Sequence, residues 1–453
     1  MRDFKQHPIG VHPPASKHTA GDVCHPLNKI PLVRIPMNMQ IGPGCKAIVQ
    51  KGDKVEVGMV IGEPIAAMSV PIHASVSGEV LSVKKEIMAD SRECEFVEIK
   101  NDGKFTPWEG ITPPVVQSKD DFIAAVRASG LVGLGGAGFP THFKLNPPPD
   151  KKIDYLLVNA MECEPYITTD DYLIRHHVDE IMEGIDLVMR YASIPHCVIG
   201  LERNTPEAFR VLSEELKRDN LGRDIKIERL KAMYPQGAEK VLIRSLTGRQ
   251  VPSGGLPHDV GCLVMNVGSV RHIAHYLKTG MPLTRRFITL DGPALNRSGI
   301  YDVPIGARIR DLIEASGGLA KVPEKIIMGG PMMGVAISDP DSPILKMNNA
   351  ILVFDAESAD LPDEGPCIHC GRCSNVCPMM LLPTELDRFS RERKVEKLQA
   401  YAIMDCIECG SCTYICPAKR FLVQNIRIGK GYVKDAMAAA KAAAQAEAAK
   451  ANK

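Results

Sequence analysis

The sequence is organised around one cysteine-rich stretch, which reads CIHCGRCSNVCP from Cys367 to Pro378 and CIECGSCTYICP from Cys406 to Pro417. Both halves have the spacing C-x2-C-x2-C-x3-C-P, so the stretch is an internal duplication that holds eight of the fourteen cysteines. Thiolates at this spacing are typical ligands of paired [4Fe-4S] clusters, in which the fourth cysteine of each run reaches the other cluster. The stretch therefore predicts two clusters bound crosswise.

The crosswise rule assigns a definite set of ligands to each cluster, because three closely spaced thiolates share one cluster and the fourth points away. The predicted ligands of the first cluster are Cys367, Cys370, Cys373 and Cys416. The predicted ligands of the second cluster are Cys406, Cys409, Cys412 and Cys377.

Zinc sites and disulfides are the competing interpretations of this stretch. Structural zinc normally takes four ligands, which leaves no use for eight cysteines in two identical runs. Disulfide frameworks belong to oxidising compartments and usually to small secreted domains. Five cysteines outside the stretch are scattered, and we interpret them as structural: Cys24, Cys45, Cys94, Cys197 and Cys262. For Cys163 we favour a buried, inert cysteine, with a redox thiol as the alternative.

Length and composition limit the classes of function. A chain of 453 residues suffices for roughly two to four domains. The 55 Lys and Arg residues are balanced by 54 Asp and Glu residues, so nothing indicates a nucleic-acid partner. The polar N-terminus is not a signal peptide, and no run of about 18 apolar residues predicts a membrane span. We expect a protein of a reducing compartment that reaches a membrane only through partners.

The N-terminal part is predicted to be an irregular arm, residues 1–30, followed by a small β domain, residues 31–115. The β domain shows short strand patterns broken by glycines and resembles the barrel-sandwich fold of biotinyl and lipoyl carriers. Those carriers present a modifiable lysine on an exposed turn, where this chain has Ala66-Ala67-Met68-Ser69. We therefore interpret the domain as a scaffold without a swinging arm.

Residues 116–284 alternate helix and strand patterns, which is typical of a doubly wound α/β layer. The predicted helices are 120–128, 170–191, 206–218 and 236–246. The predicted strands are 154–159, 196–201 and 225–230. Residues 285–356 return to short strands and predict a β-grasp domain. A cluster domain at 357–428 and a helix-prone, alanine-rich tail at 429–453 complete a multidomain α/β and α+β chain.

A second chemical feature is the glycine loop, residues 130–141, which reads GLVGLGGAGFPT. Its glycines let backbone N–H groups approach an anion closely, and a helix starting near Thr141 would add its positive end. The spacing matches neither a Walker A loop nor a G-x-G-x-x-G motif after a strand. By glycine content alone, a tight packing turn remains the alternative.

Polar residues near the ends of predicted strands favour the ligand-binding interpretation, because open α/β sheets bind ligands at the carboxyl ends of their strands. They are Asn159, Glu162, Glu164, Tyr234, Glu239 and Asn266. Lys144, which lies just beyond the glycine loop, could meet an anionic ring or phosphate.

Together these motifs resemble the FMN and NADH site of the flavoprotein subunit of respiratory complex I. The whole chain except its tail resembles the C subunit of the Rnf electron-transport complex, an ion-translocating ferredoxin:NAD oxidoreductase. The resemblance implies a Rossmann-like FMN/NADH domain, an SLBB-like β-grasp domain and a ferredoxin-like C-terminal domain. It implies that FMN is bound by Gly133, Gly135, Gly136, Gly138, Lys144, Asn159, Glu162, Tyr234 and Asn266. It implies that the nicotinamide side is lined by the catalytic residues Phe139, Glu164 and Glu239.

Three positions depart from the complex I pattern. Leu134 stands in place of an arginine, Met161 in place of an acid, and Ala238 in place of the first of two glutamates. The doubled cysteine run also differs from the single cluster of the complex I subunit and favours the Rnf-type subunit.

The implied activity is that of a NAD-linked flavin iron–sulfur oxidoreductase, in which FMN exchanges a hydride with NADH and single electrons with two [4Fe-4S] clusters. The implied partners are NAD(H), the other subunits of a membrane redox complex and, through one of them, ferredoxin. The implied location is the cytoplasmic face of the cell membrane, without a transmembrane segment of its own. Two alternatives are a soluble flavin and iron–sulfur cobalamin reductase and a non-catalytic ferredoxin-like relay.

Overall fold

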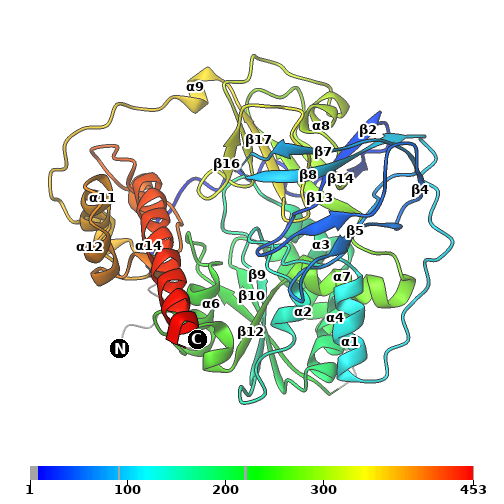
Figure 1. Ribbon diagram of the computed structural model, residues 1–453, viewed down its shortest axis with the longest axis horizontal. Coiled ribbons are helices and arrows are strands. Elements are labelled where there is room, and N and C mark those ends of the chain that lie inside the picture. Colours follow the sequence, from blue (N-terminus) through cyan, green and yellow to red (C-terminus); the bar gives the residue numbers. More distant parts are fainter. Residues whose placement is uncertain (1–8, 90–91, 219–221, 452–453) are drawn as a thin grey trace. The chain divides into compact units, whose positions relative to one another are not determined.

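The computed structural model describes residues 9–89, 92–218 and 222–451, so the first eight residues of the predicted arm lie outside it (Figure 1). The chain divides into two compact units. The sheet unit contains residues 14–230 and 257–360, and the cysteine unit contains residues 231–256 and 361–451 together with residues 9–13. The predicted boundaries differ from this division, because residues 231–256 were placed with the α/β layer.

The barrel-sandwich domain of the sheet unit is built from two antiparallel sheets. The first has the order β2-β8-β7-β4, with bounds Leu32–Pro36, Glu93–Asn101, Gly78–Ile87 and Lys54–Val55. The second has the order β3-β5-β6, with bounds Cys45–Ala47, Val60–Pro64 and Ile72–His73. Alternating apolar residues of these strands are fully buried, among them Ile35, Ile61, Val80 and Ile99. This period of two lets the sheets share one core, and the predicted fold is confirmed.

The turn that carries the lysine in carrier domains is fixed in this chain. Arg127, in α1 (Lys119–Ala128), donates from Nε to Ser69 O at 3.0 Å and from Nη2 to Ala66 O at 3.1 Å. His142, in α2 (Thr141–Lys144), places Nε2 3.0 Å from Ala67 O. A turn whose carbonyls are held by two helices cannot swing, which supports the scaffold interpretation.

A parallel sheet of order β11-β10-β9-β12 forms the doubly wound layer. Its strands have the bounds Asp224–Leu230, His196–Glu202, Tyr155–Ala160 and Cys262–Asn266. Its helices are α3 (Thr169–His176), α4 (Val178–Tyr191), α5 (Pro206–Arg218) and α7 (Val267–Thr279), with a short 3-10 turn at Pro257–Val260. Because β10 and β11 lie on one side of β9 and β12 on the other, the strand order reverses between β9 and β12.

Two helices of this layer differ from the sequence-based prediction. The single helix predicted over 170–191 is interrupted at His177, where φ is −136° and ψ is 32°. The ring of His177 packs against those of Tyr172 and Phe287, 6.1 and 5.6 Å between centroids, so contact with a distant strand fixes the break. Helix α7 was not predicted, and the predicted helix 236–246 is α6 (Glu239–Thr247) of the cysteine unit.

Replacing Gly184 with alanine is expected to lower the free energy of unfolding by about 1–3 kcal/mol, as overpacking does. Gly184 lies inside α4, where alanine would otherwise be favoured by about 1 kcal/mol. A Cβ there would lie 2.2 Å from the Val270 carbonyl oxygen, which is rigid helix backbone in α7. Thermal or urea unfolding tests this, with the exposed neighbour Glu183→Ala as the control. A Gly184→Ala protein as stable as the control would contradict the close α4–α7 packing.

A six-stranded sheet of order β1-β14-β13-β17-β15-β16 completes the sheet unit. Its strands have the bounds Cys24–Pro26, Gly299–Pro304, Arg285–Asp291, Ala350–Phe354, Lys325–Met328 and Val335–Ile337. Helix α8 (Ile309–Ala315) and the short α9 (Ala356–Ala359) accompany it. The predicted arm is therefore not irregular throughout, because β1 pairs in parallel with β14.

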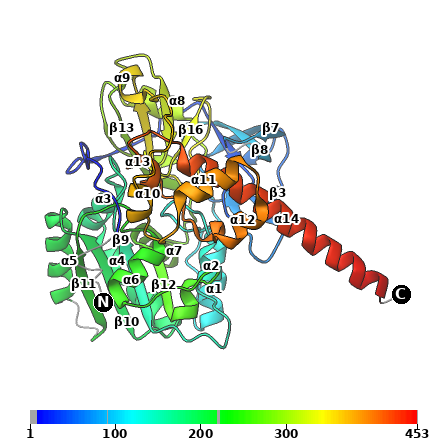
Figure 2. The ribbon, with the colours of Figure 1, turned by 90° about the vertical axis from the view of Figure 1, so that its left-hand side faces the viewer.

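The cysteine unit is helical. Its elements after α6 are α10 (Arg372–Asn375), α11 (Pro383–Arg391), α12 (Val395–Ala400), a 3-10 turn (Ile403–Asp405), α13 (Ser411–Tyr414) and α14 (Leu422–Ala451). Leu386, Leu398 and Ile426 bring α11, α12 and α14 into one small core. The boundary predicted at 428/429 falls inside α14, whose C-terminal part extends past α11 and α12 (Figure 2). Among the described helices, none has the length and apolarity needed to cross a membrane.

Candidate functional site

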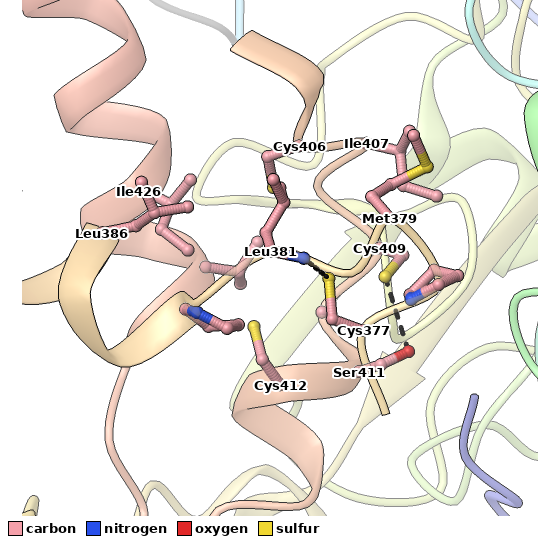
Figure 3. Close-up of a pocket in the computed structure, with 14 residues that line it drawn as sticks. Cys377, Met379, Leu381, Leu386, Cys406, Ile407, Cys409, Ser411, Cys412 and Ile426 are labelled. Atoms are coloured by element: carbon pink, nitrogen blue, oxygen red, sulfur yellow. Dashed lines mark hydrogen bonds between the residues drawn. The ribbon is translucent and has the colours of Figure 1, made fainter. Parts of the chain in front are cut away.

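Two cavities of the cysteine unit are each lined by four of the eight thiols. One is lined by Cys377, Cys406, Cys409 and Cys412 (Figure 3). The other is lined by Cys367, Cys370, Cys373 and Cys416. Each cavity thus combines three cysteines of one run with the fourth of the other. These are the same two groups that the spacing predicts as ligand sets.

The duplicated sequence produces a duplicated backbone geometry around the thiols. Two positions after the first cysteine of each run stands a left-handed residue, His369 with φ 53° and Glu408 with φ 57°. This conformation turns each N–H back toward the sulfur, at 3.4 Å from Cys367 Sγ and 3.4 Å from Cys406 Sγ. N–H donors at sulfur favour negative charge there, which is what a metal–thiolate centre requires.

The inner cavity combines four thiols with an apolar lining. Within the part of the chain that the structure describes, no three His, Cys, Asp or Glu side chains converge on one metal position. Apolar side chains, including Met379, Leu381, Ile407 and Ile426, line the cavity around the four thiols in Figure 3. Four thiolates are the ligands that one [4Fe-4S] cluster takes, so this donor set fits an iron–sulfur cluster.

Burial distinguishes the two cavities. Cys409 and Cys412 are each only 8% exposed, whereas Cys370 is an exposed thiol. Burial raises the pKa of Cys406 to about 11 and also raises the pKa of Cys412. Neutral thiols are therefore favoured there until a bound metal stabilises the thiolate form. The cavity of Cys409 is the inner one, and the cavity of Cys370 is the outer one.

Tyr234 belongs to the cysteine unit and contacts the inner cysteine run. Its side chain is 2% exposed, and its hydroxyl donates to the Cys409 carbonyl oxygen at 2.7 Å. The N–H of Val11 donates to Tyr234 O at 2.8 Å, and the N–H of Tyr234 donates back to Val11 O at 3.0 Å. Glu239, at the start of α6, belongs to the same unit. The flavin contact of Tyr234 and the nicotinamide contact of Glu239 stay predictions.

The other predicted site residues lie in the sheet unit, at the point where the strand order reverses. Asn159 of β9 and Asn266 of β12 are paired neighbours at this carboxyl edge, where open α/β sheets bind ligands. Asn266 caps α7 by accepting from the N–H of Gly268 at 2.9 Å and donates to Asp170 Oδ2 at 2.7 Å. Asn159 Oδ1 accepts from the N–H of Met161 at 3.1 Å.

The tip of the glycine loop is exposed beside this edge. A Cβ on Gly135 would lie 3.4 Å from Asn266 Cβ, so the loop runs next to the strand end. Gly136 has φ 114°, and a Cβ on it would meet no atom within 4 Å. The backbone at Gly136 is therefore open to close approach by a ligand. Gly138 is buried and has φ 67°, and Gly133 donates its N–H to Phe139 O at 2.8 Å.

Leu134, which departs from the complex I pattern, anchors the loop. Its side chain is 3% exposed and packs in the core. Its N–H donates to Ser269 Oγ at 3.0 Å, and its carbonyl accepts from Arg286 Nη2 at 3.3 Å. Sequence reasoning missed Ser269 and Arg286, because neither belongs to a recognisable motif. These contacts therefore fix the base of the glycine loop, while its tip is exposed.

The predicted acids at the end of β9 make contacts within the protein. Glu162 accepts from the N–H groups of Asp170 and Asp171 at 2.7 and 3.4 Å, so it caps α3. Burial raises the pKa of Glu162 to about 8 and the pKa of Asp170 to about 6. Glu164 accepts from the N–H groups of Met332 and Met333 at 3.0 and 2.9 Å, which ties it to the loop after β15. Hydrogen bonds within the protein therefore hold the side chains of both Glu162 and Glu164 in place.

Lys144 and Phe139 stand together beyond the glycine loop. The ammonium of Lys144 lies 6.0 Å from the centre of the Phe139 ring and donates to the Val264 carbonyl at 3.2 Å. Val264 belongs to β12, so the cation lies beside the strand that ends at Asn266. A cation near an exposed N–H loop suits a phosphate-bearing ligand.

Comparison with known families matches four successive segments of the chain. The matched family models are an RnfC barrel sandwich hybrid domain (residues 5–104), a Nuo51 FMN-binding domain (126–275), an SLBB domain (287–336) and a 4Fe-4S dicluster domain (360–417). The FMN-binding match contains the glycine loop and the strand ends, and the dicluster match contains both cysteine runs. The residues of the two candidate sites therefore lie in domains named for FMN and for [4Fe-4S] clusters.

Relatives align along almost the whole chain. The C subunit of the Na(+)-translocating ferredoxin:NAD(+) oxidoreductase complex of Acetobacterium woodii is 42% identical over 93% of this chain and 95% of its own length. The C subunit of the proton-translocating ferredoxin:NAD(+) oxidoreductase complex of Clostridium ljungdahlii is 41% identical over 92% of both chains. The C subunit of the ion-translocating oxidoreductase complex of Pseudomonas aeruginosa is 37% identical over 94% of this chain and 56% of its own length.

Among solved structures, a chain of an NAD+-reducing [NiFe]-hydrogenase superposes with a TM-score of 0.51. It is 18% identical, and the match covers 68% of this chain and 60% of the hydrogenase chain, so it supports the fold alone. The relatives that align over the whole chain decide the assignment. The chain belongs to the family of C subunits of Rnf-type ion-translocating ferredoxin:NAD(+) oxidoreductase complexes.

Proposed function

We propose that this chain is the NADH-interacting subunit of a membrane-bound ferredoxin:NAD oxidoreductase and conducts electrons between NAD(H) and partner redox subunits. The observation that carries the proposal is the presence, in one chain, of an open glycine-loop site and two four-thiol cavities. The partners are the other subunits of the complex, with ferredoxin reached through one of them. The chain works on the cytoplasmic face of the membrane.

The cofactor ligands follow from the two cavities and the sheet edge. The inner cavity supplies Cys406, Cys409, Cys412 and Cys377 to one [4Fe-4S] cluster. The outer cavity supplies Cys367, Cys370, Cys373 and Cys416 to the other. The glycine loop, Lys144, Asn159 and Asn266 hold FMN, which supplies exchange of two electrons with NADH and of single electrons with the clusters.

The protein contributes position, exclusion of water and charge. The open tip at Gly136 allows backbone N–H groups to approach the flavin phosphate, and Lys144 adds positive charge beside them. The apolar lining of the inner cavity and the burial of Cys409 and Cys412 limit the access of water to those two thiols. The exposed Cys370 gives the outer cluster a route to a neighbouring redox protein, because short distance to the surface favours electron exchange.

Anaerobic purification tests the proposal. The iron and sulfide of two four-iron clusters and one FMN are expected per chain, and NADH is expected to bleach the flavin and give cluster EPR signals. A chain that binds no flavin and shows no NADH-dependent dye reduction would instead be a non-catalytic relay. NADH-dependent cobalamin reduction without membrane subunits would support the cobalamin reductase.

Replacing Tyr234 with phenylalanine is expected to alter the inner cluster and spare the outer one. The change removes the hydrogen bond to the Cys409 carbonyl, which fixes the backbone of a ligand. A redox titration followed by EPR should show a shift on the order of tens of millivolts in one cluster, since about 59 mV corresponds to a tenfold change for one electron. Tyr401→Phe, which changes a hydroxyl elsewhere in the unit, is the control. Equal shifts of both clusters would contradict the assignment.

A further inference from the structure

The N-terminal clasp, residues 15–19, contains a lysine whose ammonium is fully used inside the protein. Lys17 Nζ donates to the carbonyl oxygens of Glu162 at 2.7 Å, Glu164 at 2.9 Å and Ile167 at 2.5 Å. An ammonium group has three N–H donors, so each is matched to one carbonyl. All three carbonyls belong to the turn between β9 and α3, and the clasp therefore holds that turn at one central point.

Further contacts align the clasp with the same turn. The N–H of Tyr166 donates to Ala15 O at 2.9 Å. The hydroxyls of Thr19 and Thr168 lie 2.5 Å apart, and both side chains are buried. Residues 15–19 thus run beside residues 162–168 and make main-chain, hydroxyl and ammonium contacts in succession.

Lys17 also balances the charge of buried acids at the carboxyl edge of the sheet. Glu162 is 9% exposed and Glu202, at the end of β10, is 3% exposed. Burial raises the pKa of Glu162, of Glu202 and of Asp170, and the charge of Lys17 opposes that rise at all three. Without this cation, the edge that is to receive an anionic cofactor would lose a positive charge that acts on all three buried acids.

The same turn connects residues that lie beside the proposed flavin site. It begins at the end of β9, next to Asn159, and ends at α3, where Asp170 accepts from Asn266 Nδ2 at 2.7 Å. Displacement of the turn therefore moves Asp170 and with it the side chain of Asn266, beside which Gly135 lies.

We propose that Lys17 is a positioning residue of the flavin site, whose ammonium fixes the 162–167 turn and thereby sets the affinity for FMN. The inference rests on the proposed function, because it assumes that FMN binds at this sheet edge. It is distinct from direct phosphate binding by Lys17, since no N–H of the ammonium is left for a ligand.

The test uses the full chain with Lys17→Ala, which leaves three converging carbonyls and space for a small cation. FMN affinity is measured by fluorescence titration, and iron content is measured in the same samples. Loss of the three hydrogen bonds donated by this half-buried cation is expected to weaken FMN binding about tenfold or more. Methylammonium chloride should restore part of the affinity, because its ammonium can donate to the same carbonyls. Tetramethylammonium chloride at equal concentration should not, because it has no N–H donor.

Matched variants separate the possible outcomes. Lys29→Ala removes an exposed lysine of the same arm and should bind FMN as the unsubstituted protein does. Lys17→Met keeps an apolar side chain that fills the space. It should weaken FMN binding, and methylammonium chloride should not restore the affinity. This variant provides a second measurement if the alanine variant is unstable. Unchanged affinity in Lys17→Met and Lys17→Ala, or equal restoration by both salts, overturns the inference. Absence of FMN from the unsubstituted protein overturns the proposed function instead.

Discussion

Substitution of Cys377 by alanine is expected to abolish the cluster held by Cys406, Cys409 and Cys412, although Cys377 lies in the other cysteine run. Cys377 lines the cavity of those three thiols (Figure 3). A cubane that loses one of its four thiolates loses a covalent bond to iron and is open to solvent at that corner. We therefore expect about half of the iron to be lost and the outer cluster to remain.

The decisive comparison is between variants of different runs. If ligation is crosswise, the EPR and absorption spectra of Cys377→Ala should match those of Cys406→Ala and differ from those of Cys367→Ala. In the same way, Cys416→Ala should match Cys367→Ala, because these two thiols share the outer cavity. Cys24→Ala, which changes a cysteine outside both runs, is the control and should keep all iron. A Cys377→Ala spectrum that matches Cys367→Ala would show ligation within each run.

The clusters that remain in the Cys377→Ala and Cys416→Ala variants should also differ in how fast they lose iron. The outer cavity has the exposed Cys370, whereas Cys409 and Cys412 of the inner cavity are buried. The cluster that survives in Cys377→Ala should therefore lose iron to a chelator faster than the cluster that survives in Cys416→Ala. Equal rates would contradict the assignment of inner and outer sites.

Features with local causes could be predicted from the sequence. The start of α1 follows from Ser118 and Asp121, whose side chains cap each other's N–H groups as the pattern predicts. Three of the four strands of the parallel sheet, β9, β10 and β11, were predicted to within about two residues, whereas β12 was not predicted. Cysteine spacing grouped the thiols in the same way as the two cavities do, since the duplicated run specifies its own backbone turns.

Features that depend on distant partners could not be predicted in this way. Lys17 binds three backbone carbonyls, and a carbonyl acceptor leaves no mark in the sequence. The segment 231–256 joins the cysteine unit, where Tyr234 donates to a carbonyl 175 positions away. Glu162 was expected to bind FMN because of the family motif, and only the fold shows that it caps α3. Tertiary contacts decided these points, and local propensity did not.

Substitution of Gly136 by valine is expected to remove FMN and leave both clusters in place. The backbone of Gly136 has φ 114°, a conformation that a β-branched residue rarely adopts, although a Cβ there would meet no atom within 4 Å. The loop is expected to move in order to release strain of about 1–3 kcal/mol. If FMN needs the native loop, this strain corresponds to roughly ten- to hundredfold weaker FMN binding. The added side chain also enters the space that the ligand approaches. FMN content and fluorescence titration measure the effect, and iron content reports the clusters.

Gly52→Val is the matched control, because it introduces the same strain away from the site. Gly52 has φ 96°, lies in an exposed turn of the barrel-sandwich domain, and also has open space where a Cβ would be. Both variants should lose a similar amount of thermal stability, and only Gly136→Val should lose FMN. If both variants lost FMN equally, the effect would be general destabilisation, and the glycine loop would not be the flavin site. If Gly136→Val lost iron together with FMN, the flavin site and the clusters would not be independent, contrary to the separate thiol cavities of the cysteine unit.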